Sequence, residues 1–438
     1  MDLASMQLQE SISEFERSSV RTDRLRSLFL CYMSLDDPLV HTQVINYVEG
    51  LARRGHVIHL VTWEMRRISR ADRAATLTAL RVRGIEWHPL RYHKRPTVPA
   101  TAFDVACGIL LGVLLILRHR LTAIHAYSHV PAAIGLALAR LTGRRLIFDH
   151  RGLLAEEYAD VGRWDPNGVP YRLTKWTERR AIERAAATVV LTRRVVPHLF
   201  DHPTPMAHRV IPCCADLRQL AAQLDGRSEV RKALGIGHRP VMVYVGKFTG
   251  WYMEREMVDF FATAREVISD LHFLVLTQSD AWLIERECDA LGVCRGDYTV
   301  TCVPHTKVGS YLAAADFAIS FVRPVPSKVS SSPTKIGEYL GAGLPVVSTA
   351  RIGDVDELLS EYRAGVLVRQ FTHDGYICAA REVQRMLRDP CAPDRCRDAA
   401  RERLSLEDVA IPRYDELYRF IAESSARRNT PPVSGGDG

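Results

Sequence analysis

Short runs of β-branched and aromatic residues alternate with amphipathic helical segments along most of the chain. A series of strand, helix and strand units builds a parallel sheet with helices on both faces, so this alternation restricts the fold strongly. In the first unit a strand at 25–33 is followed by a helix that ends near Gly55 and a second strand at 57–63. The helix carries apolar residues at helical spacing, namely Val40, Val44, Tyr47, Val48 and Leu51. We expect an α/β protein with doubly wound, Rossmann-like sheets.

The expected strands form two series, each long enough for a complete sheet. The first comprises residues 25–33, 57–63, 85–90, 123–127, 146–149, 188–191 and 210–211. The second comprises residues 241–245, 273–276, 298–303, 317–322, 346–348 and 366–368. A chain of 438 residues also exceeds what one hydrophobic core usually serves. Two Rossmann-like domains are therefore predicted, facing each other across a cleft at the carboxyl ends of their strands.

The boundaries of these parts follow from turns and composition. We expect a disordered polar leader at 1–24, an N-terminal domain at 25–212, a C-terminal domain at 213–405, a helix at 406–424 and a disordered tail at 425–438. Pro212 marks the crossing between the domains, so the hinge is placed at residues 211–216. The helix at 406–424 is expected to pack back near the hinge through one apolar stripe, formed by Tyr414, Leu417, Tyr418 and Ile421.

Cysteine and charge content exclude several classes of protein. The ten cysteines include no CxxC pair, which argues against a zinc site and against a disulfide scaffold and favours a reducing cytoplasm. The net charge of +7 comes from 58 basic and 51 acidic residues spread along the chain, without the basic tract of a nucleic-acid binder. This balance suits an anionic small substrate, or a peripheral contact with an acidic membrane surface.

One long apolar run raises the question of a membrane span. Residues 105–117 are apolar throughout, but the run is shorter than the roughly 20 residues that cross a bilayer. We predict a buried helix there. The first residues lack a charged segment followed by an apolar one, so no signal peptide is expected.

The segment 317–347 carries the most chemical information, because it contains a strand, a polar loop, a helix and a further strand. Ser332 suits the N-cap and Pro333 the first helical position, and the helix is expected to end at Gly343. Its free N–H groups and positive dipole end form an anion site, to which Lys335 adds a full charge. Glu338 lies on the same face and can accept bonds from sugar hydroxyls while Lys335 holds phosphate. The alternative is an ordinary surface ion pair; for the ligand role, both side chains are expected to be partly exposed.

This helix resembles that of the retaining, nucleotide-sugar-dependent glycosyltransferases of the GT-B fold, in particular family 4. The pattern Pro-x-Lys-x-x-Glu-Tyr-Leu-Ala-x-Gly-x-Pro-Val is matched by Pro333, Lys335, Glu338, Tyr339, Leu340, Gly343, Pro345 and Val346. Upstream, the stretch from Val303-Pro to Tyr-Leu-Ala-Ala-Ala-Asp316 resembles a second family segment, and Gly353 to Leu359 resembles a third. The resemblance covers residues 208–370 well and 25–200 more loosely.

The resemblance implies a donor site in the C-terminal domain and an acceptor site in the N-terminal one. Glu338 would bind the ribose of the donor nucleotide and Lys335 its diphosphate. Gly246 and Lys247 match the Gly-Arg or Gly-Lys that follows the first strand of the C-terminal domain, and Lys247 would also hold phosphate. Residues at the start of the helix complete the donor set: Ser331, Ser332 and Thr334. The implied co-substrate is a UDP, GDP or ADP sugar, and no other cofactor is expected.

Two positions depart from the family pattern. Ser330 stands where many members have Glu, eight residues before the helix glutamate. Members often have a second Lys shortly after Gly-Arg, and the matching stretch here, 248–253, contains none. Any contact to the donor made by that carboxylate or that lysine must be made differently in this chain.

Strand ends of the N-terminal domain supply the remaining candidates. The strand at 146–149 runs into His150 and Arg151, and family members often carry a His here that faces the donor sugar, so His150 is the expected catalytic residue. A structural cap is the alternative for His150. Acceptor-side candidates are Arg151, His125 and, in a loop that replaces the glycine pair usual in the family, Asp36 and Asp37.

The resemblance implies transfer with retention to a glycan, lipid-linked or small-molecule acceptor, with the leaving phosphate helping to deprotonate the acceptor hydroxyl. Cationic side chains and a helix N-terminus can stabilise the departing diphosphate, so no metal is needed. Asp354 and Asp356 resemble a DxD metal pair, but we interpret them as structural. An inverting transferase, a nucleotide-sugar epimerase and an inactive nucleotide-binding subunit remain alternatives.

Overall fold

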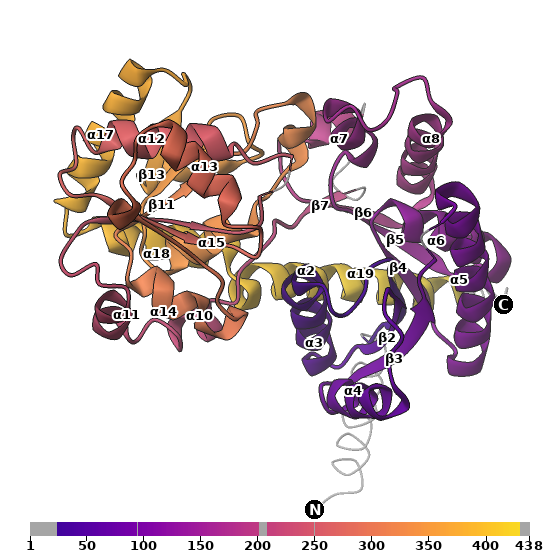
Figure 1. The fold of residues 1–438 in the computed structure, drawn as a ribbon. Coiled ribbons are helices and arrows are strands. Elements are labelled where there is room, and N and C mark those ends of the chain that lie inside the picture. Colours follow the sequence, from indigo (N-terminus) through magenta and orange to yellow (C-terminus); the bar gives the residue numbers. More distant parts are fainter. Residues whose placement is uncertain (1–23, 94, 201–207, 249, 430–438) are drawn as a thin grey trace, which may run out of the picture.

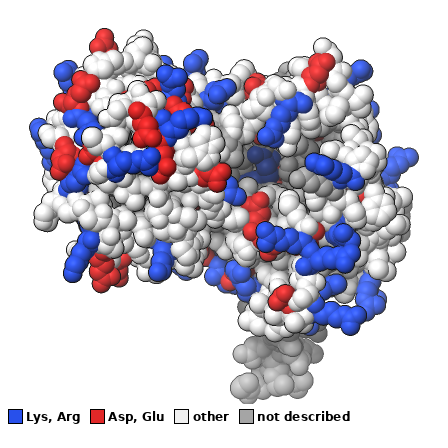
Figure 2. Space-filling view, viewed as in Figure 1, with Lys and Arg blue, Asp and Glu red and all other residues white. Residues whose placement is uncertain are grey.

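The computed structural model describes residues 24–93, 95–200, 208–248 and 250–429, and places them in two domains side by side (Figure 1). Each domain is a parallel sheet with helices on both faces. Figure 2 shows a hollow at the junction of the two domains, with basic side chains near it. The fold is therefore GT-B, as predicted: two doubly wound Rossmann-like domains.

The N-terminal sheet has seven parallel strands in the order β3-β2-β1-β4-β5-β6-β7. Its strands are β1 (Arg26–Cys31), β2 (Val57–Glu64), β3 (Ile85–Arg91), β4 (Ala123–Tyr127), β5 (Arg145–His150), β6 (Ala187–Val190) and β7 (His208–Val210). Its helices are α2 (Pro38–Val40), α3 (Asn46–Arg53), α4 (Arg70–Val82), α5 (Thr97–His119), α6 (His129–Thr142), α7 (Leu154–Asp160), α8 (Val169–Arg184) and α9 (Val196–Leu199), with η1 (His41–Ile45) between α2 and α3.

The C-terminal sheet has six parallel strands in the order β10-β9-β8-β11-β12-β13. Its strands are β8 (Val241–Val245), β9 (His272–Leu276), β10 (Tyr298–Thr301), β11 (Phe317–Ser320), β12 (Val346–Thr349) and β13 (Gly365–Val368). The helices of this part are α10 (Leu217–Ala221), α11 (Arg227–Ala233), α12 (Glu254–Ala264), α13 (Trp282–Ala290), α14 (Val308–Ala313), α15 (Thr334–Gly341), α16 (Val355–Glu361), α17 (His373–Leu387), α18 (Ala392–Leu404) and α19 (Ile411–Asn429), and the short turns include η4 (Pro326–Ser330) and η5 (Leu406–Ala410).

Successive side chains of each strand point to opposite faces of the sheet, and each face packs against its own hydrophobic core. In β1, Leu28 and Leu30 face the layer of α5, α6 and α8, whereas Phe29 and Cys31 face α3 and α19. In β8, Val243 belongs to the core under α15 and α18, and its neighbour Tyr244 to the core under α12 and α17. All strands of both predicted series are present, with ends shifted by a few residues at most.

The domains are joined by two chain crossings that pair with each other. Ala215 N–H donates to the carbonyl of Leu404 at 2.8 Å, and Leu406 N–H donates to the carbonyl of Ala215 at 2.9 Å. The first crossing lies in the segment predicted as the hinge. From the second crossing α19 runs back along the N-terminal domain (Figure 1), where Tyr414, Leu417, Tyr418 and Ile421 are buried in its core.

Two expectations about helices are wrong. The run at 105–117 lies in the 23-residue helix α5, which buries only one face: Leu110 is 73% exposed and Leu117 66%. The reason is that a helix on the outside of a sheet can bury one side only. The disordered tail expected from residue 425 is wrong for residues 425–429, because α19 continues to Asn429. Residues 1–23 of the predicted leader at 1–24, and residues 430–438, lie outside the described residues.

Candidate active site

Helix α15 starts at Thr334, at the carboxyl edge of the C-terminal sheet and next to the N-terminal domain. The predicted cap is wrong in detail: Pro333 occupies the N-cap position, and no side chain caps the helix. Ser332 Oγ instead accepts a hydrogen bond from Cys213 N–H at 3.1 Å, across to the hinge. The helix ends at Gly341, and Gly343, with φ +79°, makes the turn that follows.

Lys335 is buried, contrary to the expectation of a partly exposed side chain. Its ammonium lies 4.2 Å from the ring centre of Tyr244 and 3.9 Å from that of Tyr252, and it has no hydrogen-bond partner among the described residues. Burial lowers the pKa of Lys335 to about 7 from 10.5, and nearby Glu338 opposes that shift only in part. The site therefore contains a cation without a bonded anion.

Gly246 places the end of β8 directly against this ammonium. It has φ +141°, and a Cβ atom there would lie 2.7 Å from Lys335 Nζ. Tyr339 keeps α15 next to the strand end, because its hydroxyl accepts a hydrogen bond from Val245 N–H at 2.7 Å. Lys247 follows and is exposed. The structure thus brings together Gly246, Lys335 and the start of α15, as the resemblance implies.

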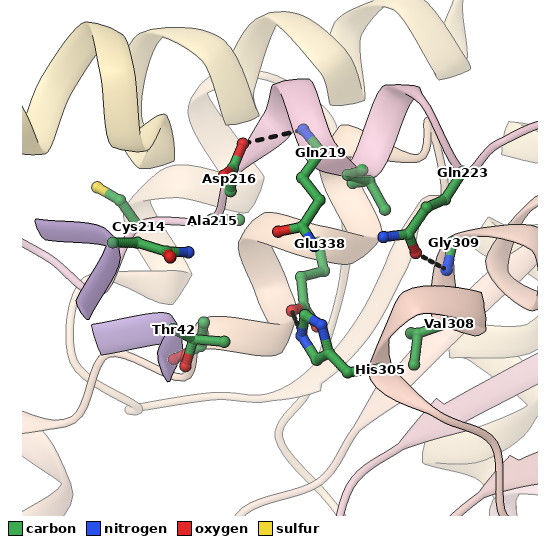
Figure 3. Close-up of a pocket in the computed structure, with 13 residues that line it drawn as sticks. Thr42, Cys214, Ala215, Asp216, Gln219, Gln223, His305, Val308, Gly309 and Glu338 are labelled. Carbon is green, nitrogen blue, oxygen red and sulfur yellow. Dashed lines mark hydrogen bonds and ion pairs between the residues drawn. The ribbon is translucent and has the colours of Figure 1, made fainter. Parts of the chain in front are cut away.

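Glu338 lines a pocket between the domains, shown in Figure 3. Its side chain points towards His305, with 3.9 Å between Glu338 Oε1 and His305 Nε2, while burial raises its pKa. Both domains contribute to the pocket. Its lining includes Thr42 and Asn46 from the N-terminal domain, and Cys214, Gln219, Gln223, Gly309 and Thr334. The side chain of Glu338 is 21% exposed, as expected, and a partly exposed carboxylate beside polar groups is suited to accept bonds from sugar hydroxyls.

Arg151 and Gln43 connect this helix to the N-terminal domain. Arg151 Nη2 donates to Gln43 Oε1 at 3.0 Å and lies 3.1 Å from Cys213 Sγ, and Gln43 Nε2 donates to Thr334 Oγ1 at 3.2 Å. The predicted acceptor-side Arg151 therefore lies next to the donor helix. Gln43 was missed, because its position on η1 gives no sign that it reaches the other domain.

Ser330, the residue that replaces the family glutamate, is buried in the contact between the domains. Its hydroxyl accepts a hydrogen bond from Leu153 N–H at 3.1 Å and donates one to Ser327 O at 2.8 Å. Ser331, one residue on, is half-buried and lines a separate cavity beside Thr192 and Asp354.

The loop at 250–253 contains no lysine of its own, but a lysine from another segment of the chain lies beside it. Lys328 Nζ lies 3.7 Å from the ring centre of Trp251 and 2.8 Å from Glu157 Oε1 of the N-terminal domain. Sequence reasoning missed Lys328, because it reaches Trp251 only through the tertiary fold.

Asp354 and Asp356 bind backbone amides. Asp354 accepts hydrogen bonds from Arg193 N–H at 2.7 Å and Arg194 N–H at 3.2 Å, both in the N-terminal domain. Asp356 accepts one from Arg351 N–H at 2.8 Å. Both carboxylates thus hold backbone segments in place, and the absence of a metal at this pair stays a prediction.

His150 does not face the cleft, contrary to expectation. Its side chain is 1% exposed and its Nε2 lies 2.9 Å from Glu178 Oε2 on α8. Side chains alternate along β5, so Asp149 and Arg151 point to the hinge side and His150 points to the opposite face. The structure thus supports the alternative, a structural role for His150.

His129 and Glu178 complete a cluster whose ligand atoms converge with those of His150 within 4.8 Å. Metal-bound histidines normally donate through their second nitrogen, but Nδ1 of both rings has no partner among the described residues. Lys175 already bonds the other oxygen of Glu178. These residues fit a hydrogen-bonded cluster better than a metal site.

The other acceptor-side candidates are not among the residues that line the pocket of Glu338. His125 is buried, with Nδ1 2.8 Å from the Tyr418 hydroxyl of α19. Asp37 caps α2 by accepting a hydrogen bond from Leu39 N–H at 2.9 Å, and Asp36 is exposed. For His125 the cause is again strand alternation, which turns it to the face that α19 covers.

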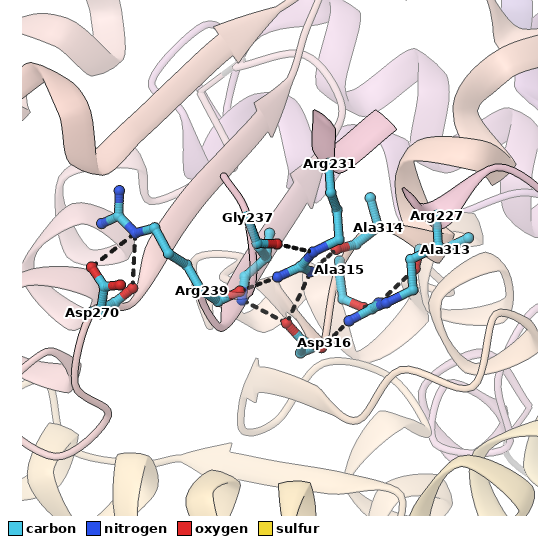
Figure 4. A network of polar contacts seen from close by, with 10 residues as sticks. Arg227, Arg231, Gly237, Arg239, Asp270, Ala313, Ala314, Ala315 and Asp316 are labelled. Atoms are coloured by element: carbon cyan, nitrogen blue, oxygen red, sulfur yellow. Dashed lines mark hydrogen bonds and ion pairs between the residues drawn. The ribbon is translucent and has the colours of Figure 1, made fainter. Parts of the chain in front are cut away.

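Asp316, which ends the family segment Tyr-Leu-Ala-Ala-Ala-Asp, lies at the amino end of β11, at the opposite edge of the sheet from the start of α15. Its carboxylate accepts hydrogen bonds from Val241 N–H at 2.8 Å and from Arg227 at 2.7 Å, and Arg231 lies 3.5 Å away (Figure 4). Arg231 also donates to the carbonyl of Gly237 at 2.8 Å. This network ties α11 and the start of β8 together.

Comparison with known families identifies the class of protein. Residues 40–214 match the model of the glycosyl transferase 4-like domain, and residues 239–389 match that of the glycosyl transferases group 1. Together the two models span most of both domains. The chain belongs to the family 4-like glycosyltransferases of the GT-B fold, and it is a glycosyltransferase enzyme.

Individual relatives are distant. The alpha-D-kanosaminyltransferase of Streptomyces kanamyceticus is 25% identical over 226 residues, which are 50% of this chain and 55% of that protein, so the match spans about half of its length. A glycosyltransferase from Rickettsia africae superimposes with a TM-score of 0.68 at 14% identity, covering 93% of this chain and all of that one. Anabaena Alr3699/HepE in complex with UDP-glucose gives 0.63 at 14% identity, covering 90% and 99%.

The Asp316 network predicts a change in stability without a change in catalysis. Asp316→Asn removes the charge that faces two arginines, so we expect the free energy of unfolding to fall by about 1.5 to 3 kcal/mol. Turnover of the folded enzyme should be unchanged, because the start of α15, with Lys335, lies at the other edge of the sheet. Urea denaturation checks the first value and steady-state kinetics the second. Exposed Asp280→Asn is the control and should have little effect on either.

The buried Lys335 predicts a pH-dependent gain in stability on its removal. The unfolded chain keeps this lysine protonated until its ordinary pKa of 10.5, whereas the folded protein releases the proton near pH 7. The unfolded state therefore binds more protons between these values, and wild-type stability rises with pH in that window. Lys335→Met should be more stable than wild type by about 1 to 4 kcal/mol at pH 6, and by less at pH 9.

Denaturation of both proteins at the two pH values measures this difference. Exposed Lys232→Met is the matched control and should give the same small change in the free energy of unfolding at both pH values. A gain for Lys335→Met that is constant with pH would contradict the assignment of a buried, easily deprotonated lysine.

Proposed function

We propose that the enzyme transfers a sugar from a nucleoside-diphosphate sugar to an acceptor hydroxyl with retention of configuration and without a metal ion. The observation that carries the proposal is the buried ammonium of Lys335, which lies against Gly246 at the start of α15 and has no bonded anion. A diphosphate would supply the missing negative charge. The N–H groups of the first turn of α15 and the exposed Lys247 add to the positive electrostatic potential at the same place.

In the proposed reaction the bond between the anomeric carbon and the diphosphate oxygen breaks, and a bond to the acceptor oxygen forms. Negative charge grows on the leaving diphosphate, so the cations that face it stabilise the transition state more than the ground state. The acceptor proton passes to the leaving phosphate. Glu338, in the pocket with His305, would bind the ribose. The structure of Anabaena HepE with UDP-glucose supports a nucleotide sugar as donor.

A thermal-shift screen against UDP, GDP and ADP and their sugars tests the donor. A ligand at 100 times its dissociation constant stabilises the folded state by about 2.7 kcal/mol, so one nucleotide should raise Tm clearly. With that donor and a panel of acceptors, NMR of the product should show the same anomeric configuration as in the donor. An inverted product would contradict retention, and free sugar formed without any acceptor would favour the epimerase alternative.

Substitutions of Lys335 and of Glu338 should have different effects on the kinetic constants. Lys335→Ala should lower both donor affinity and turnover, because charge on the diphosphate grows during the reaction. Glu338→Gln should raise the donor KM about tenfold with a smaller loss of kcat, because the ribose does not change charge. Steady-state kinetics with varied donor separate the two constants. Exposed Glu382→Gln is the control, and wild-type constants for both test variants would remove this helix from the active site.

Activity should survive excess EDTA. The proposal assigns stabilisation of the leaving group to Lys335, Lys247 and the start of α15, and the two aspartates of the DxD-like pair accept backbone hydrogen bonds. Initial rates with and without chelator measure this. A rate that falls with EDTA and returns with magnesium or manganese would contradict the assignment.

A further inference from the structure

Helix α5 presents an apolar face to solvent over most of its length. Every residue that is exposed between positions 98 and 117 is apolar. The face is formed by Phe103, Ala106, Leu110, Leu114 and Leu117, whose spacing places them on one side of the helix. We call this the α5 face. Soluble proteins rarely expose a continuous apolar stripe of this length unless something covers it.

Positive charge surrounds the α5 face. Residues 91–145 contain eight Lys and Arg and a single Asp, a net charge of +7 that equals that of the whole chain. The rest of the sequence is thus balanced, contrary to the expectation of basic residues spread evenly. The single acid, Asp104, is buried and accepts a hydrogen bond from the Tyr32 hydroxyl at 2.7 Å. Exposed arginines precede and follow the helix: Arg91, Arg95, Arg118, Arg120 and, on α6, Arg140.

The opposite face of α5 is fixed in the N-terminal domain. A Cβ atom on Gly108 would lie 2.8 Å from Ile134 and Trp63 side-chain atoms, and one on Gly112 would lie 2.5 Å from Leu138. These glycines let α5 pack closely on α6. Among the described residues α5 is the one helix long and apolar enough to cross a bilayer. Its packed face would have to leave the core for that, so the helix suits a position in the plane of a membrane surface instead.

We propose that the α5 face docks on an anionic lipid bilayer, with the helix axis parallel to the membrane. The apolar side chains would enter the boundary between headgroups and acyl chains, and the surrounding arginines would contact anionic headgroups. Figure 1 shows α5 at the side of the N-terminal domain that faces away from the C-terminal domain, so docking there leaves the junction of the domains free. A bilayer at this position implies that the acceptor is lipid-linked. This statement about the acceptor rests on the proposed function.

Charge favours a membrane over a second copy of the chain. In a symmetric dimer the same patch meets itself, so the arginines around one α5 face would approach those of the other. Like charges brought together across an interface oppose association. Figure 2 shows that basic side chains outnumber acidic ones on the visible surface of the N-terminal domain. An anionic bilayer supplies both an apolar interior and a complementary charge.

Vesicle co-sedimentation of the full chain tests the proposal. We expect binding to vesicles of phosphatidylcholine mixed with phosphatidylglycerol, and weaker binding to phosphatidylcholine alone. Leu110→Glu with Leu114→Glu should lower the partition coefficient at least tenfold for both kinds of vesicle. Arg118→Gln with Arg140→Gln should lower it only for the anionic vesicles, by roughly fivefold for each arginine, the equivalent of about 1 kcal/mol.

Matched controls change the same residue types elsewhere. Val82→Glu with Leu291→Glu alters two exposed apolar residues, and Arg255→Gln with Arg381→Gln alters two exposed arginines. Both controls should bind vesicles like wild type. Wild-type protein that stays in solution with anionic vesicles would overturn the proposal. So would a dimer in analytical ultracentrifugation that the Leu110 and Leu114 changes convert to monomer.

Nucleotide binding separates this proposal from the proposed function. The Leu110 and Leu114 variant should show the same thermal shift with the donor nucleotide as wild type, which also shows that it folds. If wild type binds vesicles but no nucleotide, the proposed function fails and the docking surface stands. If it binds nucleotide but no vesicles, the docking surface fails alone.

Discussion

Contact between helix α15 and the two chain crossings determines where the proposed donor site lies. Gly337 allows this contact, because a Cβ atom there would lie 3.2 Å from Ala215 Cβ and 3.4 Å from Leu404 Cβ, one on each crossing. The crossings are themselves paired through backbone hydrogen bonds. The helix that carries Lys335 and Glu338 is therefore fixed to the hinge, and the position of the N-terminal domain relative to the site depends on the same few residues.

The same region shows a conflict between stability and function. An ammonium group without a bonded anion is unfavourable in a protein interior, and two tyrosine rings compensate it only in part. A structure optimised for stability alone would place an apolar residue at position 335. Retention of a lysine there is understandable when an anion completes the site during the reaction, because an environment that is poor in water then strengthens the attraction.

The fold was predictable because periodicity and turn residues are local properties of the sequence. The placement of Lys335 and Glu338 on one helix was also predictable, because the start of that helix is recognisable in the sequence, and their roles stay a prediction. Residues that make contacts across the domain junction were not predictable: Gln43 and Lys328 have no sequence signal, because their contacts depend on how two distant segments meet. His150 was placed on the wrong face for a related reason. The end of a strand shows at which edge of the sheet a residue lies. It does not show towards which of the two faces of the sheet the side chain points, which depends on the pairing with the neighbouring strands.

The chain has positive charge in two different environments. At the domain junction, Lys335 and Lys328 are buried beside aromatic rings, where screening by salt is weak and a single charge can select a diphosphate. Around α5 the arginines are exposed, so each interacts weakly, and only several of them beside an apolar stripe can hold a surface. Net charge alone cannot distinguish these arrangements. The distinction comes from burial, which suits the first to the proposed binding of one small anion and the second to the proposed contact with many headgroups.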